Sequence, residues 1–258
     1  MNQILSGILK FTKVGKDAYL KQLKGFSEKT KPLAAIISCV DSRVIPSKFL
    51  CSNIGEVFIE RNPGNFICCE NSALSHFSEV CVTPGFLDFI LFRCKINDII
   101  ICGHSDCRAM GLLNNFRNCI HDHTIHKNVN ETAVTEPSPL EKWIWENGKK
   151  TLQNYNPKSG IISFSSSIHP GCPTLELDFT KINELTEVDK LSQANVLQQM
   201  INIYSYQVLL SQLTQRRLRV HGMWFTLHSG DIHLYSRLNK AFLPVNQETI
   251  SSLTKELN

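Results

Sequence analysis

The sequence predicts an α/β protein with a mainly parallel central sheet flanked by helices, an N-terminal helical arm and a C-terminal hairpin. Two short β-branched apolar runs, Ala34–Ile37 and Ile99–Ile101, have the pattern of buried parallel strands. Segments with helical periodicity alternate with these runs, and two late strand-like segments are joined by a turn at Ser229 and Gly230. Strands that alternate with helices indicate a sheet that is covered on both faces.

The elements are expected in a regular order along the chain. Apolar side chains at Ile4, Leu5, Ile8 and Leu9 follow helical spacing, which predicts an amphipathic first helix over about residues 2–24. The strands are expected at about residues 33–38, 56–60, 99–102, 218–227 and 231–236. The other helices are expected from Pro46, at about residues 84–95 and 109–117, around Trp143 and Trp145, and at about residues 181–213, with an exposed loop at about 118–138.

The composition is that of an ordinary globular protein. A length of 258 residues, 42% of them hydrophobic, fits a single domain over residues 1–258, with residues 1–28 as the helical arm. The 27 basic residues exceed the 23 acidic ones without forming a basic tract, so no nucleic-acid partner is expected. No apolar stretch reaches the roughly 18 residues of a membrane span, so no membrane partner is expected either.

The N-terminal segment lacks the apolar core and cleavage site of a secretory signal, which predicts an intracellular, cytoplasmic protein. The segment is basic and contains no acidic residue before Asp17. The mitochondrial matrix is therefore the alternative location.

Two clusters of metal-ligand residues follow the two apolar runs. Cys39 comes after the first run, and His104 and Cys107 come after the second. Because ligands bind beyond the carboxyl ends of parallel strands, we expect these three side chains to converge. Two thiolates and one imidazole suit Zn²⁺, and three protein ligands leave a fourth position for water, as in catalytic zinc sites. The alternative is a pair of buried structural cysteines, since the ten cysteines of the chain do not form a disulfide-type pattern.

Asp41 and Arg43 lie next to the first ligand and are the candidate catalytic pair. A carboxylate two residues from a ligand can reach the fourth position of the metal or accept a hydrogen bond from its water. The guanidinium of Arg43 can hold that carboxylate away from the metal by a bidentate pair. The alternative interpretation is a surface salt bridge of little consequence.

Three blocks of sequence in this order resemble the β-class carbonic anhydrases: Cys39–Val44, Arg61–Asn65 and Gly103–Cys107. The resemblance extends to Leu191–Asn195 and to the late hairpin from Val220, so that it covers nearly the whole chain. The stretches at residues 1–9, 103–110 and 191–200 resemble the animal members in particular.

The resemblance implies one zinc ion per chain, held by Cys39, His104 and Cys107. It implies that the pair Asp41 and Arg43 is catalytic, and that Asp41 itself is a fourth zinc ligand in a closed, inactive state. The implied activity is the reversible hydration of carbon dioxide to bicarbonate and a proton through zinc-bound hydroxide.

The resemblance also implies an apolar substrate pocket at a dimer interface, with Phe58, Pro63 and Phe89 as its lining residues. The implied assembly is a homodimer or a dimer of dimers. Arg108 departs from the family pattern, because a glycine often follows the second cysteine there.

Two other functions share some of these features. A zinc-stabilised structural or interaction protein would have the same ligands, but a closed structural site would not need Asp41 and Arg43. A hydrolase of carbonyl sulfide or carbon disulfide would share the ligands and the fold and would differ in access to the pocket.

Overall fold

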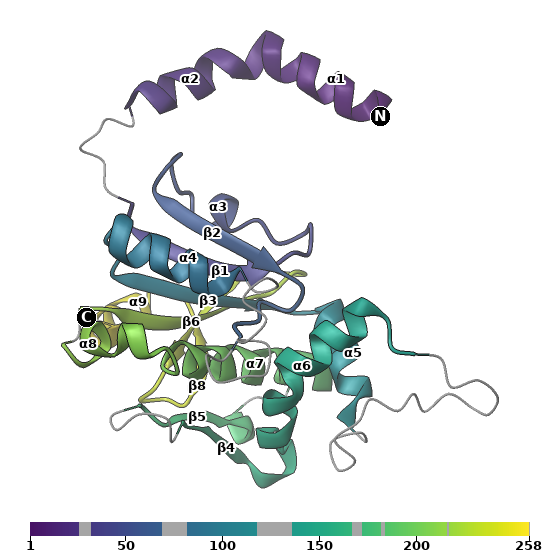
Figure 1. The fold of residues 1–258 in the computed structure, drawn as a ribbon, viewed down its shortest axis with the longest axis vertical. Coiled ribbons are helices and arrows are strands. Elements are labelled where there is room, and N and C mark those ends of the chain that lie inside the picture. Colours follow the sequence, from purple (N-terminus) through teal and green to yellow (C-terminus); the bar gives the residue numbers. More distant parts are fainter. Residues whose placement is uncertain are drawn as a thin grey trace.

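A six-stranded mixed sheet forms the centre of the computed structural model, which describes residues 1–25, 32–68, 82–117, 136–166, 172–181, 184–215 and 217–257 (Figure 1). Its strands lie in the order β2-β1-β3-β6-β7-β8; the first four are parallel to one another, and the β6–β7 and β7–β8 pairs are antiparallel. This confirms the predicted mainly parallel sheet and the C-terminal hairpin. The strands are β1 Ala34–Cys39, β2 Val57–Asn62, β3 Asp98–His104, β6 Arg219–Phe225, β7 Ile232–Ser236 and β8 Ala241–Pro244.

Helices flank this sheet, and the first two form an arm that extends away from it (Figure 1). The helices are α1 Asn2–Lys10, α2 Lys16–Gly25, α3 Pro46–Phe49, α4 Thr83–Asp88, α5 Arg108–Asn115, α6 Pro139–Asn154, α7 Glu187–Ile203, α8 Leu210–Thr214 and α9 Ile250–Leu257. A π-helical turn joins α1 to α2, and neither helix has a buried residue. No helix in the described part of the chain has the length and apolar character needed to cross a bilayer.

The central strands bury side chains on both faces of the sheet. In β1, Ala35 and Ile37 belong to the large core cluster, while Ile36 faces a smaller cluster that includes Phe49 of α3. This alternation follows from the two-residue period of a strand. Both faces are therefore covered, as the continuous apolar runs of the sequence predict.

The prediction of a single long helix over residues 181–213 is wrong. The structure divides this region into α7, a 3₁₀ turn at Gln207–Leu209 and α8. The start of α7 is fixed by Thr186, whose hydroxyl accepts a hydrogen bond from the backbone N–H of Asp189 (3.1 Å). The hydroxyl of Ser205 donates to a carbonyl of the last turn of α7, which satisfies a carbonyl that the helix leaves free.

Two strands of four residues, β4 Ile161–Phe164 and β5 Leu175–Asp178, form a separate antiparallel pair that the sequence pattern does not predict. Strands this short contain too few residues to show a clear period. Most of the loop predicted for residues 118–138 lies outside the described residues.

The order of the strands brings the carboxyl ends of β1 and β3 together at a topological switch point. From β1 the chain passes to β2 on one side and later to β3 on the other. Such points are the ligand-binding positions of open α/β sheets. Cys39 is the last residue of β1 and His104 is the last residue of β3.

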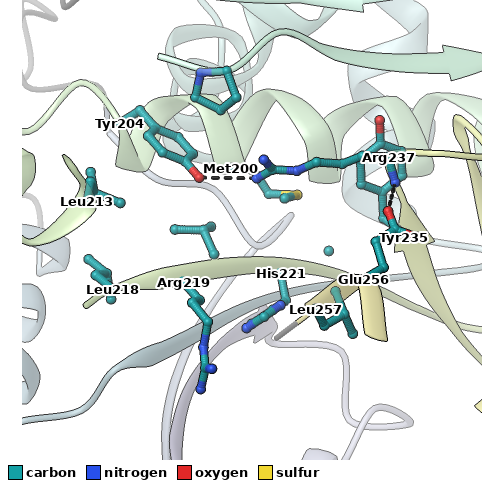
Figure 2. A pocket seen from close by; sticks show the side chains of 13 residues that line it. Met200, Tyr204, Leu213, Leu218, Arg219, His221, Tyr235, Arg237, Glu256 and Leu257 are labelled. Atoms are coloured by element: carbon teal, nitrogen blue, oxygen red, sulfur yellow. Dashed lines mark hydrogen bonds between the residues drawn. The ribbon is translucent and has the colours of Figure 1, made fainter. Parts of the chain in front are cut away.

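The opposite end of the sheet carries an ion-pair cluster. Asp98 accepts hydrogen bonds from Nε and Nη2 of Arg219 at 2.8 and 2.7 Å and lies 2.8 Å from Nε2 of His221. Figure 2 shows Arg219 and His221 on the other side of β6 from Met200 and Arg237, which face a cavity of about 470 Å³. Arg219 and His221 are also among the residues that line this cavity. The cluster lies at the first residues of β3 and β6, at the opposite end of these strands from the switch point.

Asp98→Asn is expected to lower the stability of the protein in a pH-dependent way. Burial alone would raise the pKa of Asp98, but hydrogen bonds from His221 and Arg219 outweigh it and lower the pKa from 3.8 to about 2. A depressed carboxyl pKa contributes stability above the unfolded-state value and loses it as the pH falls towards the folded-state value. We expect Asp98→Asn to cost roughly 2 kcal/mol at neutral pH. The difference from the native chain should shrink between about pH 4 and pH 2, as measured by urea unfolding; a constant difference would contradict this.

Candidate metal centre

Three buried side chains from separate elements converge at the switch point. Cys39 ends β1, His104 ends β3, and Cys107 is the N-cap residue of α5. Their potential ligand atoms all lie within 4.8 Å of one another, and the two sulfurs are 4.0 Å apart. Two sulfurs at about 2.3 Å from a tetrahedral zinc ion would be separated by about 3.8 Å. The observed spacing therefore fits this metal.

The imidazole of His104 is oriented as a metal ligand. Its Nδ1 lies 2.8 Å from the backbone carbonyl of Ser105, which can only accept a hydrogen bond, so Nδ1 carries the proton. Nε2 then presents a lone pair, and this buried atom has no hydrogen-bond partner in the described structure. A histidine fixed through one ring nitrogen while the other faces the site is the usual arrangement of zinc ligands.

The two cysteines have opposite pKa shifts. A hydrogen bond from Cys107 is the largest influence on Cys39 and, against the effect of burial, lowers the pKa of Cys39 to about 4. The same hydrogen bond and burial raise the pKa of Cys107. Hydrogen bonds from the backbone N–H groups of Gly64 and Asp41 lower the pKa of Cys39 further. The two sulfurs are within hydrogen-bonding distance of each other, and a divalent cation that binds both displaces the protons that they carry.

Arg43 holds the carboxylate of Asp41 from two directions. Its Nε and Nη2 donate to the two oxygens of Asp41 at 3.0 and 2.7 Å, and its backbone N–H donates to Oδ1 at 3.0 Å. These bonds keep the pKa of Asp41 well below its usual range. The group of converging ligand atoms does not include Asp41, so its role as a fourth ligand in a closed state stays a prediction.

Asp106 is a second partner of Arg43 that the sequence pattern does not identify. Its carboxylate accepts from Nη1 of Arg43 at 2.6 Å and its carbonyl accepts from Nη2 at 3.0 Å. Asp106 lies between His104 and Cys107 and has a left-handed backbone, with φ of 50°. Its position inside the second cluster is the sequence signal that could have drawn attention to it.

Arg61 is a further residue whose role emerges from the structure. From the end of β2 it donates to the carbonyls of Cys39 (3.1 Å), Asp41 (2.6 Å) and Val44 (2.8 Å). The guanidinium thereby fixes the backbone that carries the first ligand and the candidate catalytic pair. The sequence signal is its position at the start of the turn-rich block that ends at Asn65.

A cavity of about 420 Å³ opens beside Cys39. Its lining includes Asp41 and Arg43, the predicted pocket residue Pro63, and Arg108. The apolar remainder of the lining consists chiefly of Val40, Ala109, Leu112, Leu140 and Ile144. The site therefore combines charged groups beside the ligands with an apolar wall.

The other two predicted pocket residues, Phe58 and Phe89, pack against each other edge to face with ring centroids 5.7 Å apart. They do not belong to the lining of this cavity in the single chain. Phe89 is about half exposed. Their part in a substrate pocket stays a prediction.

Fold and site together define a class of protein: an α/β metalloprotein in which a Cys₂His centre borders an open cavity, as in catalytic zinc sites. A sequence model described as "Carbonic anhydrase" matches residues 34–232. Beta carbonic anhydrase 1 of Caenorhabditis elegans is 34% identical over 264 aligned residues, which cover 100% of this chain and 93% of that protein. The carbonic anhydrase of Helicobacter pylori strain J99 is 27% identical, with 95% and 94% covered.

Solved structures show the same fold. The β-carbonic anhydrase CcaA has a TM-score of 0.68 at 21% identity, with 96% of this chain and 92% of that chain covered. The chain belongs to the carbonic anhydrase family, and its relatives place it in the β class. It is thus a carbonate dehydratase, and its metal is zinc.

Proposed function

We propose that the enzyme hydrates carbon dioxide in the cavity beside Cys39, with Asp41 and Arg43 as the catalytic pair. The ligands of its single zinc ion are Cys39, His104 and Cys107. The observation that carries this proposal is the bidentate Asp41–Arg43 pair in the lining of a cavity that also reaches a metal ligand.

Bound zinc supplies a Lewis acid that brings the pKa of its water from about 15.7 towards neutrality. Asp41 is ionised and accepts a hydrogen bond from the attacking water, which orients the lone pair of that water towards the substrate carbon. Arg43 supports this role because it occupies both carboxylate oxygens and keeps Asp41 from ligating the metal. The apolar wall of the cavity holds carbon dioxide, which has no charge to be solvated.

The alternatives are less well supported. A structural zinc site would be closed by a fourth protein ligand, whereas the residues that the structure describes group three ligands beside a cavity. Stopped-flow measurement of carbon dioxide hydration tests the proposal, with carbonyl sulfide and carbon disulfide as competing substrates. Zinc-dependent hydration as the main activity is the expected result. Faster turnover of either sulfur compound would favour the hydrolase instead.

We further propose that the chain assembles as a homodimer or a dimer of dimers through its N-terminal arm. The arm exposes an apolar face formed by Ile4, Leu5, Ile8 and Leu9, each of which is more than half exposed in the single chain. Exposed apolar faces of this kind mark interaction sites, and most soluble oligomers are symmetric homo-oligomers. Tetrameric β-carbonic anhydrases from Sordaria macrospora are among the solved structures with this fold.

Charges placed on this apolar face are expected to dissociate the assembly. The double variant Leu5→Glu and Leu9→Glu should shift the sedimentation coefficient towards that of the monomer, because burial of two carboxylates in an apolar interface is unfavourable. The matched control, Gln3→Glu with Ser6→Glu, adds the same charge on the polar side of α1 and should leave the assembly intact. Equal sedimentation of the two double variants would argue against the arm as the interface.

A further inference from the structure

One face of α7 contacts both ligand-bearing parts of the metal centre. Asp189, Ser192 and Asn195 are spaced three residues apart and therefore lie along one side of the helix. All three side chains are buried or nearly so. Helix α7 itself packs on β3 and β6, directly beside the switch point.

Two of these side chains bond the backbone around the second pair of ligands. The hydroxyl of Ser192 donates to the carbonyl of His104 at 2.8 Å. The carboxylate of Asp189 accepts the backbone N–H of Asp106 at 2.8 Å. The two contacts lie on either side of Ser105, whose carbonyl orients the His104 ring. The conformation of this short segment is thus fixed from α7.

Asn195 makes the corresponding contact beside the first ligand. Its Nδ2 donates to the carbonyl of Gly64 at 3.0 Å, and the backbone N–H of Gly64 is a donor to the sulfur of Cys39. Gly64 has a φ of 88°, and a Cβ there would come within 2.4 Å of the Phe66 ring. The turn therefore requires glycine at this position, and the hydrogen bond from Asn195 connects it to α7.

The side chains on α7 are themselves immobilised. Ser192 accepts from Nε1 of Trp224 at 3.1 Å. The side-chain oxygen of Asn195 accepts from Thr151 and from Gln199, both at 2.9 Å. Ser192 and Asn195 are thus each held in one orientation by further bonds, which makes their contacts with the ligand segments precise.

A core helix does not need such residues for packing. Burial of a hydroxyl, an amide and a carboxylate is unfavourable unless each is hydrogen-bonded, and apolar side chains of similar size would pack without that cost. The contact with Asp106 also extends to the catalytic pair, because Asp106 bonds Arg43. The polar face of α7 therefore has a use that is separate from the stability of the core.

We propose that α7 is a positioning element of the zinc centre, in which Asp189, Ser192 and Asn195 hold the backbone of both ligand segments in the geometry that binds the metal. This inference rests on the zinc site of the proposed function. Because the three side chains bond backbone groups and supply none of the grouped ligand atoms, they act through the positions of Cys39 and His104.

Matched pairs of variants test the proposal in the full-length protein. Ser192→Ala removes a buried hydroxyl that bonds the His104 carbonyl, whereas Ser205→Ala removes a buried hydroxyl that bonds the carbonyl of Asn202. Asn195→Asp removes the donor to Gly64 and keeps an acceptor for Thr151 and Gln199. Its control, Gln198→Glu, makes the same amide-to-carboxylate change at a buried residue whose side chain bonds those of Asn154 and Asn202.

The readouts are the zinc dissociation constant, from competition with a chromophoric chelator, and the absorption spectrum of the cobalt-substituted protein. Ser192→Ala and Asn195→Asp are expected to weaken zinc binding by a factor of about 10 to 100 and to alter the cobalt spectrum. Ser205→Ala and Gln198→Glu should bind zinc within about twofold of the native chain. Urea unfolding of the metal-free proteins shows whether each α7 variant and its matched control lose the same amount of stability.

Two outcomes would overturn the proposal: native zinc affinity in both α7 variants, or an equal loss of affinity in variants and controls. The same titration includes the native chain and Cys39→Ser. If the native chain bound no zinc, or bound it independently of Cys39, the proposed metal site would be wrong. If the native chain bound zinc through Cys39 and the Ser192 and Asn195 variants bound it equally well, the metal site would stand. Only the proposed positioning role of α7 would then be wrong.

Discussion

His104→Ala is expected to abolish both bound zinc and carbon dioxide hydration. The imidazole is one of the three ligands that the described residues bring together, and Nε2 is the buried ring atom that faces the two sulfurs. Without it the centre retains two thiols, which can share a proton instead of a metal ion. Metal analysis should show less than about a tenth of the native zinc, since loss of a ligand costs more than the 10- to 100-fold typical of outer contacts. The hydration rate should fall to the uncatalysed level.

The same result is expected for Cys39→Ser, because a serine hydroxyl stays protonated where a thiol ionises to a thiolate. His233→Ala is the matched control. His233 also has a buried ring nitrogen without a partner in the described structure, but it belongs to no group of metal ligands among the described residues. That variant should keep its zinc. Hydration that persisted in a zinc-free His104→Ala protein would refute the assignment.

The three ligands could be predicted because each follows a local pattern that the sequence displays. Cys39 comes at the end of a β-branched run, and so does the segment that contains His104 and Cys107. A parallel sheet with a switch point between these strands brings their ends together, whatever the details of the loops. The fold class and the metal were therefore accessible from local sequence alone.

The residues that support the ligands could not be predicted in this way. Asp106 and Arg43 are separated by 63 residues, and Asp189 bonds a backbone group 83 residues away. Contacts of this kind depend on how the elements pack against one another, for example α7 against the sheet. The periodicity of a short stretch of sequence does not indicate this packing. The division of the predicted helix at residues 181–213 has a similar origin, because side-chain hydrogen bonds at Thr186 and Ser205 set its ends.

Arg43→Ala is expected to give a folded, zinc-bearing protein whose turnover is reduced roughly 10²-fold or more, the range for loss of a positioned proton-transfer group. The guanidinium does not contact the ligand atoms, so the metal should stay. Asp41, however, loses both side-chain bonds that fix its oxygens and becomes free to rotate towards the metal. Arg43→Lys should also be impaired, because an ammonium cannot form the bidentate pair.

Arg219→Ala provides a control of the same chemistry at the other end of the sheet. Arg219 forms a bidentate pair with Asp98 through Nε and Nη2, as Arg43 does with Asp41, but it lies outside the cavity beside Cys39. Its removal should lower the free energy of unfolding and leave turnover unchanged. Zinc content, turnover and urea unfolding measured on both variants separate the two roles. If Arg43→Ala resembled Arg219→Ala in turnover, the Asp41–Arg43 pair would be a structural ion pair and Arg43 would have no part in the mechanism.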